Sequence, residues 1–270
     1  MTNQSESQAR QWVSVPYEIT TGIGSRAHIG MVVISNDQTL SYEARAMLSL
    51  PGIALYESRV PTARGSGQAV SKDTLRQQAD KIGTAIKLIN SMRPSDVIAL
   101  GCTSAAMVIG QSELERLVRE VHPGALVTDP FRGIKAALKA LKSRRIGYVS
   151  PYPHDVASDM VHALENMGMD VTSVCTFSNP TGFIGDEAPF ISPESVADAI
   201  RTAVRTADAD TIVVACTQMR AAHVIDALER ETGKRIISSN QALCWHALRL
   251  AECDDDVPGW GQLFRLGIGD

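Results

Sequence analysis

The sequence lacks most of the features that mark a specialised class of protein. It has neither a CxxC nor an HxxxH spacing, which argues against the usual zinc sites. Its longest apolar run falls short of the roughly 20 residues that cross a membrane. The N-terminal stretch MTNQSESQARQWVSVPYE is polar and has no apolar core of the kind found in signal peptides.

Charge and composition are also ordinary. A net charge of −4 over 270 residues gives no electrostatic reason to expect nucleic acid or an anionic membrane as a partner. Hydrophobic residues make up 44% and charged residues 21%, as in soluble globular proteins. We therefore expect a cytoplasmic protein without metal, nucleic acid or membrane partners.

What the sequence does contain is a matched pair among its cysteines. The odd total of five, without close pairs, argues against a disulfide framework and favours reduced thiols. Cys102 lies in SDVIALGCTS (95–104) and Cys216 in ADTIVVACTQ (209–218). In both segments an acidic residue leads into an apolar run that ends in Cys-Thr.

Apolar runs alternate with helical patterns along the whole chain. Uninterrupted apolar runs are typical of parallel strands, which are covered on both faces. The expected strands are 28–35, 53–60, 97–101, 125–129, 145–150, 170–177, 211–216 and 235–239. The expected helices are 39–50, 71–92, 104–119, 130–141, 154–167, a helix from about 192, 219–231 and 240–251. This alternation predicts an α/β fold with parallel sheets.

The pattern restarts in the middle of the chain. Three ordered segment pairs align: 25–37 with 143–155, 95–104 with 209–218, and 126–141 with 236–251. The repeat predicts two pseudo-symmetric Rossmann-like domains with the active site in the cleft between them. We expect an N-terminal arm (1–25), a first domain from 26–130 plus about 240–270, and a second domain from 131–239.

The two cysteines are the leading candidates for catalysis. A Cys-Thr at the carboxyl end of a parallel strand lies where open α/β sheets bind ligands. Helix-start amides there would favour a thiolate and could hold a substrate carboxylate. Thr103, Ser104 and Thr217 would complete such an anion cradle. The plainer alternative is that Cys102 and Cys216 are buried core thiols and that the hydroxyls only cap helices.

Further candidates end other strands. Asn36, Asp37 and Thr39 follow the first strand and could position a substrate, although Asn-Asp is also common turn chemistry. Tyr152 lies between two prolines in SPYPHD and could donate to an oxyanion. His154 could act as a general base or could simply begin the next helix.

Three basic or amide side chains are weaker candidates. Asn240 begins the last long helix and is expected to cap it or to reach the first half of the chain. Arg59 and Arg64 flank a glycine-containing segment, PTARGSGQ (61–68), and could attract a carboxylate. The segment itself could form a lid.

Four of these motifs together resemble a known superfamily. They are GCTS (101–104), SPY (150–152), ACTQM (215–219) and SSNQALCWHALRL (238–250). Over about residues 27–252 the chain resembles the aspartate/glutamate racemase superfamily, in the branch of maleate cis–trans isomerases, arylmalonate decarboxylases and ectoine-utilisation proteins. The resemblance implies two pseudo-symmetric α/β domains and neither metal nor organic cofactor.

The resemblance also implies roles for residues. Cys102 would attack the substrate double bond, Cys216 would assist as acid or base, and Tyr152 with Thr103 and Ser104 would hold carboxylate oxygens. The chain departs from the maleate isomerases after the first strand, where they carry Ser-Ser-Asn and Thr-Thr. The aspartate at position 37 is more similar to the ectoine-utilisation proteins.

Three functions follow as hypotheses. The first is a cofactor-independent isomerase or racemase of a small maleate- or ectoine-like carboxylate, expected to form a homodimer. The second is an arylmalonate-type decarboxylase with Cys216 as proton donor, although such enzymes carry a glycine-type residue where this chain has Cys102. The third is a non-catalytic protein that binds a carboxylate on the same scaffold.

Overall fold

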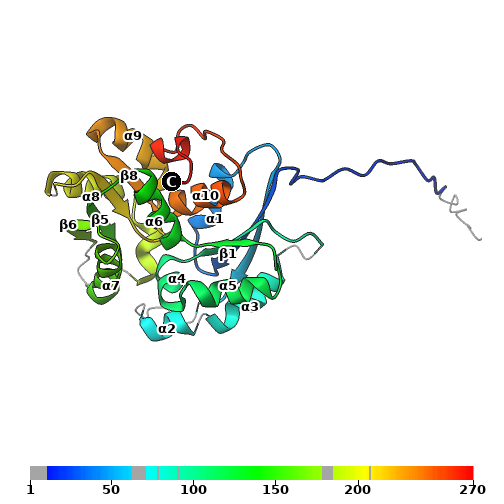
Figure 1. Ribbon diagram of the computed structural model, residues 1–270, viewed down its shortest axis with the longest axis horizontal. Coiled ribbons are helices and arrows are strands. Elements are labelled where there is room, and N and C mark those ends of the chain that lie inside the picture. The colour runs from blue at the N-terminus through cyan, green and yellow to red at the C-terminus, as the bar shows by residue number, and fades with distance from the viewer. Residues whose placement is uncertain are drawn as a thin grey trace, which may run out of the picture.

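Two parallel sheets form the body of the molecule. The computed structural model describes residues 11–62, 71–77, 79–89, 92–177, 185–206 and 208–269. Each sheet has four strands, and every pair of neighbours is parallel (Figure 1). The inner strands of both sheets are buried, because helices cover their faces, which explains why their sequences show apolar runs.

The two sheets share one topology, with strand orders β2-β1-β3-β4 and β6-β5-β7-β8. The strands are β1 (Ala27–Ile34), β2 (Ile53–Val60), β3 (Val97–Gly101), β4 (Leu126–Thr128), β5 (Arg145–Ser150), β6 (Asp170–Thr176), β7 (Thr211–Val214) and β8 (Arg235–Ser238). Strands that the internal repeat aligns, such as β3 with β7, hold equivalent places in their sheets. The predicted α/β fold with two similar halves is confirmed.

The helices follow the expected order with three differences. They are α1 (Leu40–Met47), α2 (Lys72–Arg76), α3 (Ala79–Lys87), α4 (Thr103–Ile109), α5 (Gln111–Arg119), α6 (Pro130–Ala140), α7 (His154–Glu165), α8 (Pro193–Thr206), α9 (Ala222–Thr232) and α10 (Ser239–Leu250), with 3₁₀ turns η1 (Gly185–Phe190) and η2 (Gln262–Arg265). The single helix predicted over 71–92 is two helices, α2 and α3. The helix predicted over 104–119 is also divided, because Gly110 adopts a φ of 85° between α4 and α5. The helix after Cys216 begins only at Ala222, three residues later than predicted.

No helix within the described residues is long and apolar enough to cross a bilayer. The longest, α8, is a surface helix whose buried side chains lie on one face. Its amphipathic pattern is that of a helix covering a sheet.

Helices α6 and α10 join the two halves at the centre of the molecule (Figure 1). They pack so closely that a Cβ on Gly133 would lie 2.6 Å from the carbonyl oxygen of Ala242. Helix α10 follows the second sheet in sequence but packs against β3 and β4 of the first, while α6 contacts β8. The predicted domain boundaries stay a prediction, which this exchange of helices favours.

The acidic C-terminal segment folds back onto the body. Leu263 and Phe264 are completely buried in the main hydrophobic core. The guanidinium of Arg249 donates to the carbonyl oxygens of Cys253, Phe264 and Leu266, so that one side chain links three points of the segment. Apolar residues of the tail are therefore part of the hydrophobic core.

Candidate active site

Cys102 and Cys216 follow equivalent strands, and they lie close enough for a charge on Cys102 to affect Cys216. Cys102 follows β3 directly and caps α4, and Cys216 lies two residues after β7. A charge on Cys102 would raise the pKa of Cys216, and charges on both thiols would raise the pKa of Tyr152. Both cysteines are partly exposed. The structure thus brings three of the predicted site residues into one cluster at the carboxyl ends of both sheets.

The backbone at Cys216 is strained. Its φ of 148° lies in a region that residues other than glycine rarely adopt, at a cost of about 1–3 kcal/mol. A turn rather than a helix follows, over residues 217–218. Such outliers persist only where neighbouring contacts hold them, and they cluster at functional sites.

Ser239 supplies the contact that holds Cys216. The backbone N–H of Cys216 donates to Ser239 Oγ at 3.0 Å, and Ser239 Oγ lies 2.9 Å from Thr103 Oγ1. One hydroxyl at the start of α10 therefore joins the residue after Cys102 to Cys216 itself. The sequence did not single out Ser239, although it lies inside the SSNQALCWHALRL motif.

Backbone amides lower the pKa of both thiols, as expected, but they do not decide the net pKa of either one. Burial is the largest influence, and it raises the pKa of Cys102 and raises that of Cys216 to about 12. The amides of Ser104 and Ala105 and the Ser104 hydroxyl, 3.8 Å from Cys102 Sγ, offset part of this rise at Cys102. Both sulfurs are therefore protonated thiols at neutral pH in the unliganded protein.

Asp37 is the acidic group of the cluster. It is 1% exposed, and its Oδ1 accepts from the backbone N–H groups of Thr39 and Leu40 at 2.9 Å, so it caps the start of α1. Its Oδ2 is buried and has no hydrogen-bond partner among the described residues. Its negative charge raises the pKa of both Cys102 and Cys216. Burial likewise raises the pKa of Asp37 itself.

Thr39 and Arg59, which adjoin Asp37, hydrogen-bond to backbone carbonyl groups and so stabilise the loop after β1. Thr39 Oγ1 donates to the Gln218 carbonyl at 2.8 Å, so it bridges the two halves beside Cys216. Arg59 donates to the Asp37 carbonyl at 2.9 Å and is thereby used within the loop. Asn36 is half-buried, and its Oδ1 has no partner in the described part of the chain. Of these side chains, Asn36 keeps an acceptor available.

A buried Glu43–Asn240 pair lies behind the Cys216 turn. Glu43 is 1% exposed and accepts from the Ala222 N–H at 3.1 Å and from Asn240 Nδ2 at 2.7 Å. Asn240 Nδ2 also donates to the Thr217 carbonyl at 2.9 Å. Burial raises the pKa of Glu43 to about 7. Of the two roles predicted for Asn240, contact with the first half of the chain is confirmed. The cap of α10 is Ser238 instead.

The remaining candidates divide clearly. Tyr152 is 8% exposed, and its interaction with Cys216 lowers the pKa of that thiol. Thr217 is buried beside Asp37 and lowers the pKa of that carboxyl. His154 is exposed, 3.4 Å from Ser158 on its own helix, which gives no support to a general-base role. Arg64 and the proposed glycine lid lie outside the described residues.

Two similar sheets that present a cysteine each to one cluster define a class: pseudo-symmetric α/β proteins with paired thiols. The arylmalonate decarboxylase family model matches residues 43–264. A maleate isomerase from Nocardia farcinica is 28% identical over 88% of this chain and 95% of its own length.

Solved structures agree with this match. A cysteine-to-serine mutant of the Nocardia farcinica maleate cis–trans isomerase, with a covalently bound succinylcysteine intermediate, is 27% identical, with a TM-score of 0.75 over 88% of this chain and 98% of its own. An arylmalonate decarboxylase is 25% identical, with a TM-score of 0.68 over the same shares.

The chain belongs to this family, in the maleate isomerase and arylmalonate decarboxylase branch of the aspartate/glutamate racemase superfamily. It is an enzyme of this family, and the curated relatives that it matches are maleate isomerases. Within the described residues no cluster of three histidine, cysteine or acidic side chains could hold a metal ion.

Proposed function

We propose that this enzyme isomerises or racemises a small carboxylate without a cofactor, through the thiols of Cys102 and Cys216. The observation that carries the proposal is that Cys102 and Cys216 follow equivalent strands, and that one hydroxyl, Ser239 Oγ, contacts both the Cys216 N–H and Thr103 Oγ1. The covalent succinylcysteine in the isomerase relative supports addition of a cysteine to an alkene in this family.

The surroundings of the two thiols favour different roles. The amides of Ser104 and Ala105 and the Ser104 hydroxyl stabilise a thiolate at Cys102. Cys216, whose pKa burial raises to about 12, is better suited to hold its proton. We therefore assign Cys102 as the nucleophile or base and Cys216 as the acid.

For cis–trans isomerisation, Cys102 first loses its proton to solvent, and the resulting thiolate adds to one alkene carbon while Cys216 gives its proton to the neighbouring carbon. The central bond becomes single and rotates. Cys216 then takes the proton back, the C–S bond breaks, and the alkene re-forms in the other geometry. For racemisation, Cys102 removes the α-proton and Cys216 donates one from the opposite face. Tyr152 and the hydroxyls of Thr103 and Thr217 would hold the carboxylate, whose negative charge grows in both reactions.

Asp37 favours a particular substrate class. Its carboxyl is buried and its charge acts on both thiols, so it lies beside them. Oδ2 makes no close hydrogen bond within the described residues, and the side-chain hydroxyl of Thr217 is near enough to lower the pKa of Asp37. A second carboxylate beside it would be repelled, whereas an N–H donor would satisfy it. We propose a substrate with one carboxylate and a nitrogen donor, ectoine-like in this respect, in preference to maleate.

The test is incubation with a panel of small carboxylates in heavy water, followed by proton NMR. The panel contains maleate, arylmalonates, α-amino acids and cyclic amidine carboxylates. Deuterium at the α-carbon or a change of alkene geometry supports the proposal. Binding of panel members with neither change would contradict it.

A decarboxylase is the second candidate, because the matching family model and a structural neighbour carry that name. It requires only the proton donor Cys216. Release of carbon dioxide from an arylmalonate, retained in Cys102→Ala and lost in Cys216→Ala, would favour it over isomerisation.

A further inference from the structure

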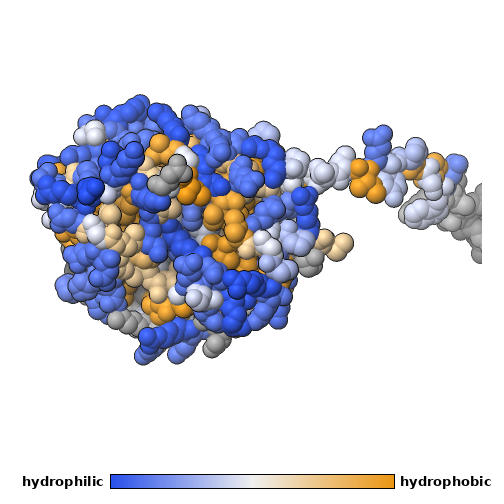
Figure 2. All heavy atoms as spheres, viewed as in Figure 1, coloured by the Kyte–Doolittle hydropathy of each residue, from blue (hydrophilic) through white to orange (hydrophobic). Residues whose placement is uncertain are grey.

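The N-terminal arm carries an unused set of apolar side chains. Trp12, Val13, Val15, Tyr17 and Ile19 are 71–90% exposed. Exposed apolar groups of this density on one segment mark an interaction surface. Figure 2 shows several hydrophobic groups on the segment that leaves the body.

The apolar residues alternate as in a strand that packs on one face. Val13, Val15, Tyr17 and Ile19 occur at every second position, which directs their side chains to one side of an extended segment. Pro16 has an even number, and the N–H groups of even and odd residues point to opposite edges of an extended segment. The missing N–H of Pro16 therefore does not interrupt the edge along which the odd-numbered residues hydrogen-bond. The pattern is that of a strand-like segment laid on another surface.

The exit of the arm is fixed away from its own body (Figure 1). Arg93 Nη1 donates to the Thr21 carbonyl at 3.3 Å, and Gly22 N–H donates to Thr20 Oγ1 at 3.3 Å. Gly22 has a φ of 76°, which only glycine adopts readily. The arm therefore leaves the body instead of folding back onto it.

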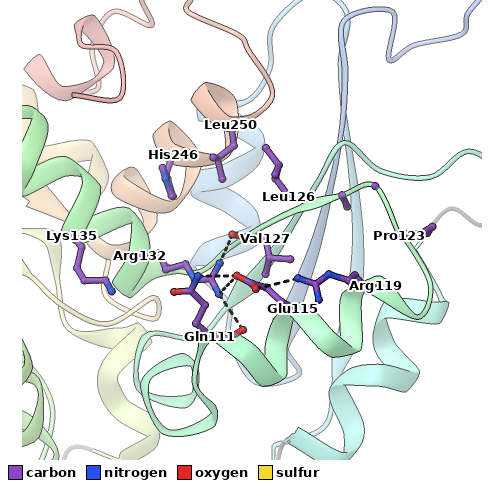
Figure 3. A pocket seen from close by; sticks show the side chains of 12 residues that line it. Gln111, Glu115, Arg119, Pro123, Leu126, Val127, Arg132, Lys135, His246 and Leu250 are labelled. Carbon is purple, nitrogen blue, oxygen red and sulfur yellow. Dashed lines mark hydrogen bonds and ion pairs between the residues drawn. The ribbon is translucent and has the colours of Figure 1, made fainter. Parts of the chain in front are cut away.

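The body offers a groove of matching character. It has a volume of about 600 Å³ and lies at the edge strand β4, between α5, α6 and α10 (Figure 3). Leu126, Val127 and Leu250 supply apolar lining, and Leu126 is 51% exposed. Hydrophobic atoms gather on this face of the body below α10 in Figure 2.

The charges of arm and groove are complementary. Glu18 is the single charged side chain among arm residues 11–24. The groove is lined by Arg119, Arg132 and Lys135 against one acid, Glu115. Glu115 pairs with both arginines, whereas the Lys135 ammonium lies 5.4 Å from the Phe131 ring and has no ion pair in the described part of the chain.

We propose that residues 12–19 of one copy dock in the β4 groove of a second copy, so that the enzyme is a dimer with exchanged arms. Val15, Tyr17 and Ile19 pack against the apolar lining on one side of the groove, and Glu18, which points to the opposite side of the extended segment, pairs with Lys135 across from that lining (Figure 3). A twofold axis makes the exchange reciprocal and fills both grooves.

The test is sedimentation velocity of the full chain across a concentration series. The unmodified chain is expected to be a dimer. The triple variant Val15→Ser/Tyr17→Ser/Ile19→Ser should weaken dimerisation by about 100-fold or more. Val174→Ser, which removes an exposed apolar side chain on β6, should leave the dimer unchanged.

A charge exchange tests the groove itself. Glu18→Lys should weaken the dimer, Lys135→Glu should weaken it similarly, and the double variant should restore it. A monomeric unmodified chain, a triple variant that stays dimeric, or a double variant without rescue would each overturn the proposal. Circular dichroism and turnover establish that each variant is folded.

Discussion

Replacing Glu43 by glutamine should remove a specific part of the pH dependence of stability. Burial raises the pKa of this carboxyl from 4.5 to about 7. The native protein therefore holds the proton more tightly than the unfolded chain does, and the free energy of unfolding falls as the pH rises from about 4.5 to 7. A rise of this size corresponds to a loss of about 3 kcal/mol above pH 7.

Glutamine removes the ionisation while it keeps an oxygen for the Ala222 N–H. Urea unfolding at pH 5 and pH 8 measures the effect. Between these values the unmodified protein should lose about 2–3 kcal/mol more than Glu43→Gln does. Glu194→Gln, at an exposed position in the first turn of α8, should follow the unmodified protein. Parallel curves for Glu43→Gln and the unmodified protein would refute the reasoning.

Three further substitutions test the site. Ser239→Ala leaves the Cys216 N–H without its acceptor and should lower the free energy of unfolding by about 1–3 kcal/mol and reduce turnover; urea unfolding and kcat that both stay unchanged would contradict this. Tyr152→Phe should lower kcat by about 10²–10³-fold with little change in melting temperature, and a kcat within threefold of the original would remove Tyr152 from the mechanism. Asp37→Asn removes a charge that raises the pKa of both Cys102 and Cys216, so iodoacetamide should alkylate these thiols from a lower pH; an unchanged pH profile of alkylation would count against this role.

The sequence predicted the features that repeat or that follow a regular period. The buried strands show as apolar runs, and the equivalence of β3 and β7 shows as two Cys-Thr segments. Because parallel strands present their carboxyl ends at one edge, the location of Cys102 and Cys216 followed from the same pattern. Gly110 was a local sign that the helix predicted over 104–119 is divided there, but the continuous helical pattern on both sides of it favoured a single helix.

The contacts that hold the site could not be predicted, because they join residues far apart in the sequence. Ser239 meets Thr103, 136 positions away, and Asn240 meets Glu43, 197 positions away. The sequence held one sign of these contacts: Glu43 lies among the apolar residues on the buried face of α1, where a carboxyl group needs a hydrogen-bond partner. The net rise in the pKa of both thiols could not be predicted for a related reason: the amides that lower these pKa values follow from a motif, whereas the burial that raises them depends on the whole fold.

The central claim is that the two thiols act as one unit, and turnover of single and double cysteine variants tests it most directly. On the best substrate of the panel, Cys102→Ser and Cys216→Ser should each lose about 10³-fold or more in kcat, and the double variant should lose little beyond either. A folded single variant that keeps its rate within tenfold of the unmodified enzyme would contradict the account.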